Sequence, residues 1–378
     1  MATELIIGDL RTGRRLLDLP FETLDWSLIR NAAGTIRVTI PISSRLVQKL
    51  GLGNATTEAK TFLCVVENDV PLEAGPIWRR VYNEPTRKLE LTAGGLWTYF
   101  DHRQIIPLLT ASQPVIDPST GESAAYANTD LVGWSYGTIA KKLLQQSEQW
   151  TGGNLPIVYA ADEAGTYERH YLGANLRKIG DELRALVDLV DGVDIRFLPR
   201  RTADRLGIEW VLQTGTIAAP EIHAAAVNVW DYSVARPSIR NLRVESDASS
   251  MAGQAWASGG RQDGVAVIER ARNTALINAG YPLLEAVDSA HADASESATL
   301  AAYAANAVRL GAAPENAWSF EVKAVDVPRV GSYLPGDYAD IKIAGDPWIP
   351  DGTYRREIAT ISGDQAGKWV KVVTEETF

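Results

Sequence analysis

Ile36-Arg37-Val38-Thr39-Ile40-Pro41 alternates apolar with polar side chains, as a β-strand with one buried face does. Proline has no backbone donor, so we expect the strand to end at Pro41. The same period of two recurs on both sides of this stretch, which predicts strands over residues 4–10, 16–19, 62–67, 77–82 and 88–93. Short strands without a long helix predict a small β-barrel domain over residues 1–104.

Residues 105–230 have helical periods instead. Ser135 is placed to cap a helix that ends before Gly152. A second apolar stripe predicts another helix, and Gly192 follows it where a left-handed C-cap is common. The helix and the two strands after it are predicted over residues 176–190, 193–198 and 208–213. We therefore expect a helix-containing α/β insert domain.

Residues 231–312 combine linking strands with an alanine-rich helix. Small residues fill positions 246–260 and have little apolar surface to bury, so we expect a loose hairpin there. Alanine and leucine along one face predict a helix over residues 295–310, and Gly311 ends it.

A second barrel is predicted at the end of the chain, over residues 313–378. After Pro314 the apolar period returns to two, with turn residues between the segments 320–322, 338–343, 354–361 and 370–372. The predicted fold class is therefore α+β and β-rich, with two small β-barrel domains and the α/β insert between them. A chain of 378 residues is long enough for such a division.

Composition and charge exclude several classes of protein. With 46% hydrophobic and 22% charged residues, the chain has the composition of a folded globular protein. Its net charge of −10 disfavours sequence-independent binding of nucleic acid. Cys64 lies in an apolar run, which indicates a buried small hydrophobe. No stretch is apolar enough for a membrane span, and eleven tryptophans suggest assembly through buried aromatic anchors.

No catalytic, cofactor-binding or metal-binding residues are predicted. The four histidines form no pair with zinc-ligand spacing; they are His102, His170, His223 and His291. Glu168-Arg169-His170 is interpreted as surface hydrogen bonding in a loop rather than as a general-base cluster. Gly51-Leu52-Gly53-Asn54 and Gly336-Asp337 are interpreted as turns. The 47 acidic residues offer no means of choosing a glycosidase pair.

Several short motifs, taken in order, carry a family resemblance. They are Asp9-Leu10-Arg11-Thr12-Gly13, Asp18-Leu19-Pro20, Trp26-Ser27, residues 91–100 with Arg103, Arg169-His170-Tyr171, Asp191-Gly192-Val193-Asp194, residues 281–285 and Pro335-Gly336-Asp337-Tyr338. In this order they resemble the minor tail proteins of siphophages that infect actinobacteria. That group is similar to the baseplate hub proteins of other tailed phages and to the N-terminal part of tail-associated lysins.

The resemblance implies a structural, non-enzymatic virion protein at the tail tip, assembled in the host cytoplasm. It implies a homotrimer whose six barrels form a pseudo-sixfold ring that continues the tail tube. The implied partners are the distal tail protein, the tape measure protein and the central fibre or spike, with DNA only in transit and no membrane insertion. The chain ends after the second predicted barrel, so cell-wall cleavage or receptor binding is expected of a neighbouring subunit.

Two other functions stay open from the residues alone. The first is a carbohydrate- or receptor-binding tail component, in which Trp134, Trp150 or Trp348 stacks on sugar rings. The second is an enzyme that cuts a cell-wall polymer through an acidic pair. Packing in a core or an interface is the simpler interpretation of most of the tryptophans, Trp97 and Trp230 among them.

Overall fold

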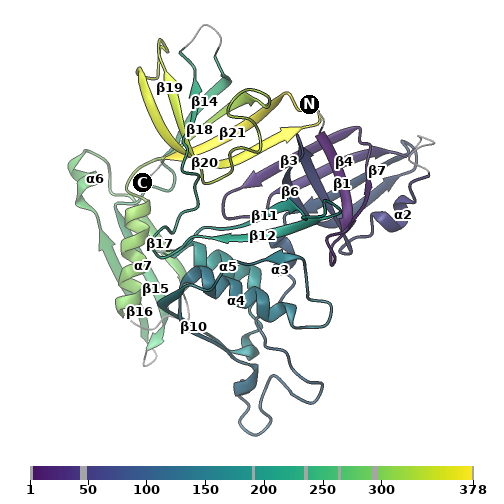
Figure 1. Ribbon diagram of the computed structural model, residues 1–378. Coiled ribbons are helices and arrows are strands. Elements are labelled where there is room, and N and C mark those ends of the chain that lie inside the picture. Colours follow the sequence, from purple (N-terminus) through teal and green to yellow (C-terminus); the bar gives the residue numbers. More distant parts are fainter. Residues whose placement is uncertain are drawn as a thin grey trace. The chain divides into compact units, whose positions relative to one another are not determined.

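The computed structural model describes residues 3–42, 49–189, 192–233, 237–262, 265–291 and 297–376 (Figure 1). Contacts within the chain divide it into two compact units. The larger unit comprises Met1–Leu242 and Ser319–Thr377, and the smaller unit comprises Arg243–Trp318. The division falls between residues 242 and 243 and between residues 318 and 319.

The larger unit is built on a thirteen-stranded sheet. Its N-terminal strands are β1 (Thr3–Asp9), β2 (Arg15–Asp18), β3 (Thr23–Ile29), β4 (Thr35–Pro41), β5 (Thr61–Glu67), β6 (Val70–Asn83) and β7 (Lys88–Gly94). Its later strands are β13 (Asn228–Asp231), β14 (Ile239–Asp247), β18 (Glu315–Lys323), β19 (Tyr338–Ile343), β20 (Gly352–Asp364) and β21 (Trp369–Glu376). The order is β14-β18-β21-β20-β3-β4-β7-β6-β5-β1-β2, with β19 paired to β20 and β13 to β19.

The β-rich α+β class is confirmed, but the predicted pair of separate closed barrels is not seen in the described residues. Strands from the two ends of the chain share one sheet, because β20 pairs antiparallel with β3 through partners such as Ile361 and Leu28. β20 is thirteen residues long, so it pairs with β19 near its start and with β3 near its end. None of the described sheets closes on itself.

Most predicted strands are confirmed, but several strands were not predicted, β3 among them. β3 has the same alternation that identified β4, with Leu24, Trp26 and Leu28 buried. β4 lies between β3 and β7, and its buried residues are Ile36, Val38 and Ile40. The unpredicted strand β3 lies between β20 and β4, so it joins the C-terminal strands of the sheet to the N-terminal ones.

The insert contains the two predicted helices, α4 (Tyr136–Glu148) and α5 (Ile179–Val187). Ser135 caps α4 as predicted, since its hydroxyl accepts from the Thr138 backbone N–H at 3.2 Å. α5 begins three residues later than predicted, because Leu176 has a left-handed φ of 48° and is exposed. The predicted left-handed cap at Gly192 is wrong. A Cβ there would lie 2.2 Å from the Val187 carbonyl oxygen, so the site requires glycine for space.

The remaining elements of the larger unit cover the sheet and complete the insert. They are α2 (Leu52–Ala55), α3 (Trp97–Phe100), β8 (Thr129–Trp134), β9 (Ile157–Val158), β10 (Ala164–Tyr171), β11 (Ile195–Arg201) and β12 (Ile208–Thr214). One hydrophobic core joins the N-terminal strands to the insert and includes Phe62, Phe100, Leu143 and Trp210. The N-terminal strands and the insert therefore share one hydrophobic core.

The smaller unit is a three-stranded sheet with a helix on one face (Figure 1, green). It consists of β15 (Gln254–Gln262), β16 (Val265–Arg272), α6 (Thr274–Asn278), β17 (Glu285–His291) and α7 (Ser297–Leu310). The predicted helix is confirmed. The predicted loose hairpin is wrong for most of its length, because β15 pairs with strands on both sides. Its small residues let α7 approach closely, so that Ala257 packs against Leu300 and Ala304.

Candidate functional site

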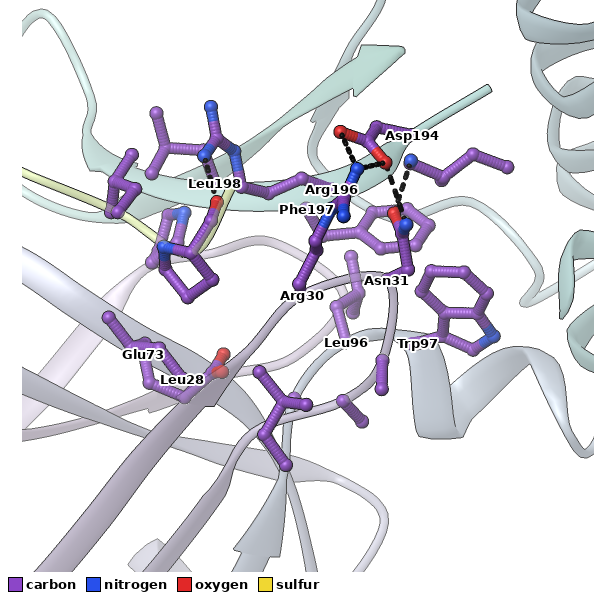
Figure 2. A pocket seen from close by; sticks show the side chains of 18 of the residues that line it. Leu28, Arg30, Asn31, Glu73, Leu96, Trp97, Asp194, Arg196, Phe197 and Leu198 are labelled. Carbon is purple, nitrogen blue, oxygen red and sulfur yellow. Dashed lines mark hydrogen bonds and ion pairs between the residues drawn. The ribbon is translucent and has the colours of Figure 1, made fainter. Parts of the chain in front are cut away.

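A small polar cavity lies inside the larger unit where segments far apart in sequence meet (Figure 2). Its volume is about 50 Å³. The lining comes from residues 28–33, 72–73, 95–97, 194–199, 222 and 334–335. Several of these residues belong to the motifs that carried the family resemblance, among them Gly95, Asp194 and Pro335. The motifs therefore converge in space although they are spread along the chain.

Arg30 lies at the centre of this site. It follows β3, and its guanidinium lies 3.0 Å from an Asp194 carboxylate oxygen and 2.7 Å from a Glu357 carboxylate oxygen. Asp194 belongs to the insert and Glu357 to β20. One arginine thus connects the N-terminal strands, the insert and the C-terminal strands.

Asp194 accepts further hydrogen bonds that fix its position. The Asn31 side-chain amide donates to Oδ1 at 2.7 Å, and the Ile222 backbone N–H donates to Oδ2 at 2.8 Å. Asn31 also accepts from the Ile195 backbone N–H at 3.0 Å. Figure 2 shows Arg30 and Asn31 both directed at Asp194. A carboxylate held by charge and by several donors is rigid, and removal of any partner leaves a buried polar group unsatisfied.

Glu357 has fewer hydrogen-bond and ion-pair partners than Asp194 within the described part of the chain. It is 7% exposed, and burial raises its pKa to about 7 although the Arg30 charge opposes the rise. Among the described residues, its second oxygen and the Arg30 Nε have no hydrogen-bond partner. The ion pair therefore carries a substantial desolvation cost, which is common where charged groups specify how segments fit together.

Glu73 is a second buried acid beside the cavity. Burial raises its pKa to about 8, while hydrogen bonds from the backbone N–H groups of Ala74 and Gly34 partly oppose the rise. The Ala74 N–H lies 2.9 Å from Oε1. A Cβ on Gly34 would lie 2.1 Å from Oε2, so glycine is required for this close approach.

A perturbed carboxyl is a frequent mark of catalysis, but the space beside Glu73 does not fit a substrate. Small-molecule sites occupy roughly 300–1,000 Å³, whereas the cavity here has about 50 Å³, enough for one or two waters. No hydroxyl, thiol or imidazole nucleophile lines it. The polar side chains around this cavity instead connect separate segments of the chain.

Asp337 connects a further pair of segments through hydrogen bonds. The turn predicted at Gly336 is present, with a φ of 97° that favours glycine. Asp337, however, is only 3% exposed. It accepts from the backbone N–H of Leu334 at 2.8 Å and from that of Ala224 at 2.7 Å. Nearby, Arg196 donates to the Pro335 carbonyl at 3.1 Å. The turn therefore also attaches the end of the insert to the start of β19.

The four histidines lie in four different segments of the chain. His102 packs against Trp78 with ring centroids 4.6 Å apart, and His223 packs against Tyr338 at 4.9 Å. His291 lies in β17. Within the parts of the chain that the structure describes, no three His, Cys, Asp or Glu side chains are grouped as metal ligands.

Glu168, Arg169 and His170 lie in β10, a strand, rather than in the predicted loop. β10 pairs with β8, and this places the His170 ring 2.7 Å from Asp130. That hydrogen bond raises the His170 pKa. Both side chains are more than half exposed, in keeping with surface hydrogen bonding.

Of the three tryptophans considered for sugar stacking, one is freely accessible. Trp348 is 87% exposed. Trp150 is half-buried and donates to the Ile106 carbonyl at 3.1 Å, while the Lys142 ammonium lies 4.7 Å from the Trp134 ring centroid. Trp97 and Trp230 are buried, as expected. Cys64 is also buried, and burial raises its pKa well above the usual thiol range.

Three residues of the central network were not predicted from the sequence. Arg30, Asn31 and Glu357 have no motif around them, and their partners lie more than 160 residues away. One local signal was available at Glu73, an acid between the apolar residues Leu72 and Ala74 in a strand. The short helix α2 likewise replaces the turn predicted at residues 51–54.

Comparison with solved structures identifies the fold. The chain is similar to the 43 kDa tail protein of prophage MuSo2 from Shewanella oneidensis, with a TM-score of 0.58, 9% identity and coverage of 99% of this chain and 98% of that one. A tail protein from Neisseria meningitidis matches with a TM-score of 0.55 and 12% identity, covering 100% and 97%. No protein-family model and no curated protein matches the sequence.

A further match comes from a secretion system. It is an E. coli component of the type VI secretion system, described as structurally similar to the T4 tail proteins gp27 and gp5. The TM-score is 0.50 at 10% identity, covering 99% of this chain and 76% of that one. At such identities the likeness concerns the fold, and the expected resemblance to tail and baseplate hub proteins is confirmed at that level.

Proposed function

We propose that the chain is a structural component of a phage tail tip, a baseplate hub protein without enzymatic activity. One observation carries the proposal: over nearly its whole length the chain has the fold of tail proteins from two prophage or bacterial sources. The likeness covers both units and the insert, which is unlike the sharing of one common module.

In the proposed assembly three copies form a pseudo-sixfold ring that continues the tail tube. Residues 1–104 and 313–378 supply the two repeating parts of each copy, with residues 105–230 as the insert and 231–312 as the link. The ring joins the distal tail protein to the central fibre or spike and contacts the tape measure protein. Support comes from the single sheet that binds the two ends of the chain together through β20 and β3.

The polar network fits a ring subunit that transmits force. Arg30, Asp194 and Glu357 come from three segments, and movement of one segment would separate buried charges. DNA is expected only in transit through the lumen, in keeping with the net charge of −10. Among the described residues, no helix is sufficiently long and apolar to cross a membrane.

The particle mass of the purified chain tests the proposal. Light scattering over a range of concentrations, followed by negative-stain imaging, should give a trimer and ring views with threefold or pseudo-sixfold symmetry. A chain that stays monomeric alone and in mixture with its distal tail protein would contradict the proposed ring.

Carbohydrate binding is the second candidate, favoured by the exposure of Trp348 alone. Exposed tryptophan rings stack on sugars as well as on proteins. A glycan array probed with the isolated chain separates the two candidates, because the hub proposal expects no specific glycan.

A further inference from the structure

Trp348 is presented on a rigid hairpin tip between β19 and β20. All eleven tryptophans lie in the described residues, and Trp348 alone has an exposed side chain, at 87%. The Asp346 carboxylate accepts from the backbone N–H groups of Trp348 at 2.9 Å and Ile349 at 2.8 Å. Asp351 accepts from the Gly345 N–H at 2.7 Å. Two ordered carboxylates thus fix the backbone on both sides of the ring.

Such an exposed, ordered tryptophan has the properties of a binding anchor. Exposing a large apolar ring to water is unfavourable, and a fixed backbone lowers the entropy lost on docking. Tryptophan is the residue type most enriched among those that dominate interface energies. The hairpin tip therefore fits an apolar groove on a partner.

The larger unit also carries an apolar groove, between the start of α4 and β12. β9 pairs with β12 only through Ile157 and Val158, after which the two segments separate. The opening between them is about 480 Å³ and is lined by Tyr159, Val211 and Leu212. A tryptophan ring buries a large apolar area when it docks, and the apolar side chains that line this opening can cover it.

The charges of the two surfaces also favour docking of the hairpin tip in this groove. The first turn of α4 lines the groove, and this thirteen-residue helix has no acidic residue there to offset its positive end. At the rim, Asp162 pairs with Lys141 and Lys142, and Glu163 accepts from the Ile217 N–H at 3.3 Å. The hairpin tip brings the acids Asp346 and Asp351, which the helix end attracts.

We propose that the Trp348 hairpin tip of one copy docks in the α4–β12 groove of the next copy. The inference rests on the proposed ring and names its contact. Anchor and groove are different surfaces of one chain, so the contact is head-to-tail, and in the proposed trimer each copy is rotated by a third of a turn so that the third copy closes the ring.

Cross-linking tests the contact directly. Cys64 is the chain's one cysteine, so a Cys64→Ser background carries no other thiol. Pro347→Cys and Ala161→Cys then place single exposed thiols beside the anchor and at the groove rim, with Trp348 retained. A short bis-maleimide should give covalent dimers and trimers only when both cysteines are present in one chain. A wild-type trimer whose double-cysteine form gives no ladder would overturn the contact.

Substitution of the anchor gives an independent measure. Trp348→Ala should weaken self-association by roughly thirtyfold or more, the equivalent of the ~2 kcal/mol that marks a central interface residue. Ala161→Trp should do the same by filling the groove. Leu206→Ala is the matched control, because Leu206 is 63% exposed on a different turn. Unchanged circular dichroism in all variants shows that folding is intact.

The outcomes separate this inference from the proposed function. A trimer that withstands both Trp348→Ala and Ala161→Trp refutes the docking site and leaves the hub proposal standing. A wild-type chain that never associates refutes the ring itself. Specific glycan binding lost in Trp348→Ala, with the trimer intact, refutes the docking site in favour of the carbohydrate alternative.

Discussion

The two units differ in how they bury their apolar surface. The larger unit has a core rich in large aromatics, with Phe62 and Trp210 packed edge to face at 5.2 Å. The smaller unit has a described cluster of Ala257, Leu300 and Ala304 under a single helix. Burial per side chain is therefore much smaller in the second unit. Its stability depends on close backbone approach, whereas the first unit depends on large side chains and buried ion pairs.

The largest expected effect is Trp210→Ala in the larger unit. Trp210 is fully buried and also donates to the Ala74 carbonyl at 3.0 Å. Its loss should lower the free energy of unfolding by about 3–5 kcal/mol, measured by denaturant titration. Leu206→Ala is the control, because Leu206 is 63% exposed and a change of less than about 0.5 kcal/mol is expected for a surface site. Equal effects would show that the aromatic core is not what stabilises this unit.

Asp194→Ala comes next. It leaves Asn31 and the Ile222 N–H without their acceptor inside the protein, and Arg30 loses one of its two ion-pair partners while keeping Glu357. We expect a loss of about 3 kcal/mol in unfolding free energy, since several donors around a buried carboxylate lose their acceptor at once. Asp18→Ala is the control, because Asp18 is exposed where it pairs with Arg15, and such surface pairs contribute little. A loss below about 1 kcal/mol would mean that the network contributes specificity without stability.

Leu300→Ala tests whether the units open independently. Leu300 is fully buried against Ala257 and Ala304, and its truncation should cost about 2 kcal/mol. Hydrogen exchange should quicken in β15, β16 and α7 while the amides of the larger unit keep their rates. Leu143→Ala, in the larger core, should give the reverse pattern. Faster exchange throughout the chain in Leu300→Ala would show a single cooperative unit.

A smaller effect is expected from pH. Burial raises the pKa of Glu73 to about 8 and that of Glu357 to about 7, from an ordinary value of 4.5. The folded protein therefore binds these protons more tightly than the unfolded chain, so stability falls as pH rises from about 4.5, the unfolded value, until the folded pKa values of 7 to 8 are passed. We expect unfolding free energy to fall by on the order of 1–2 kcal/mol between pH 5 and pH 8. Glu73→Gln should flatten this slope, and an unchanged slope would assign it to other groups.

Most single elements were predictable because their signals are local. The alternation of Ile36, Val38 and Ile40 and the cap at Ser135 each depend on a few neighbouring residues. Where the prediction failed, the observed structure depends on a contact with residues far away in the sequence. β15 looked too poor in apolar surface for an ordered strand until α7 covered it. Glu168 to His170 looked like a loop until β8 supplied a partner strand.

By itself, the sequence determined the β-rich class, the two main insert helices, the buried state of Cys64 and a composition that offers no metal or catalytic motif. Backbone geometry imposes these periods within a few residues. Only the tertiary structure decided that β20 pairs with β3 and that Arg30 meets Asp194 and Glu357. These contacts join residues more than 160 positions apart, where no spacing rule applies and the outcome depends on how the buried surfaces and charges fit together.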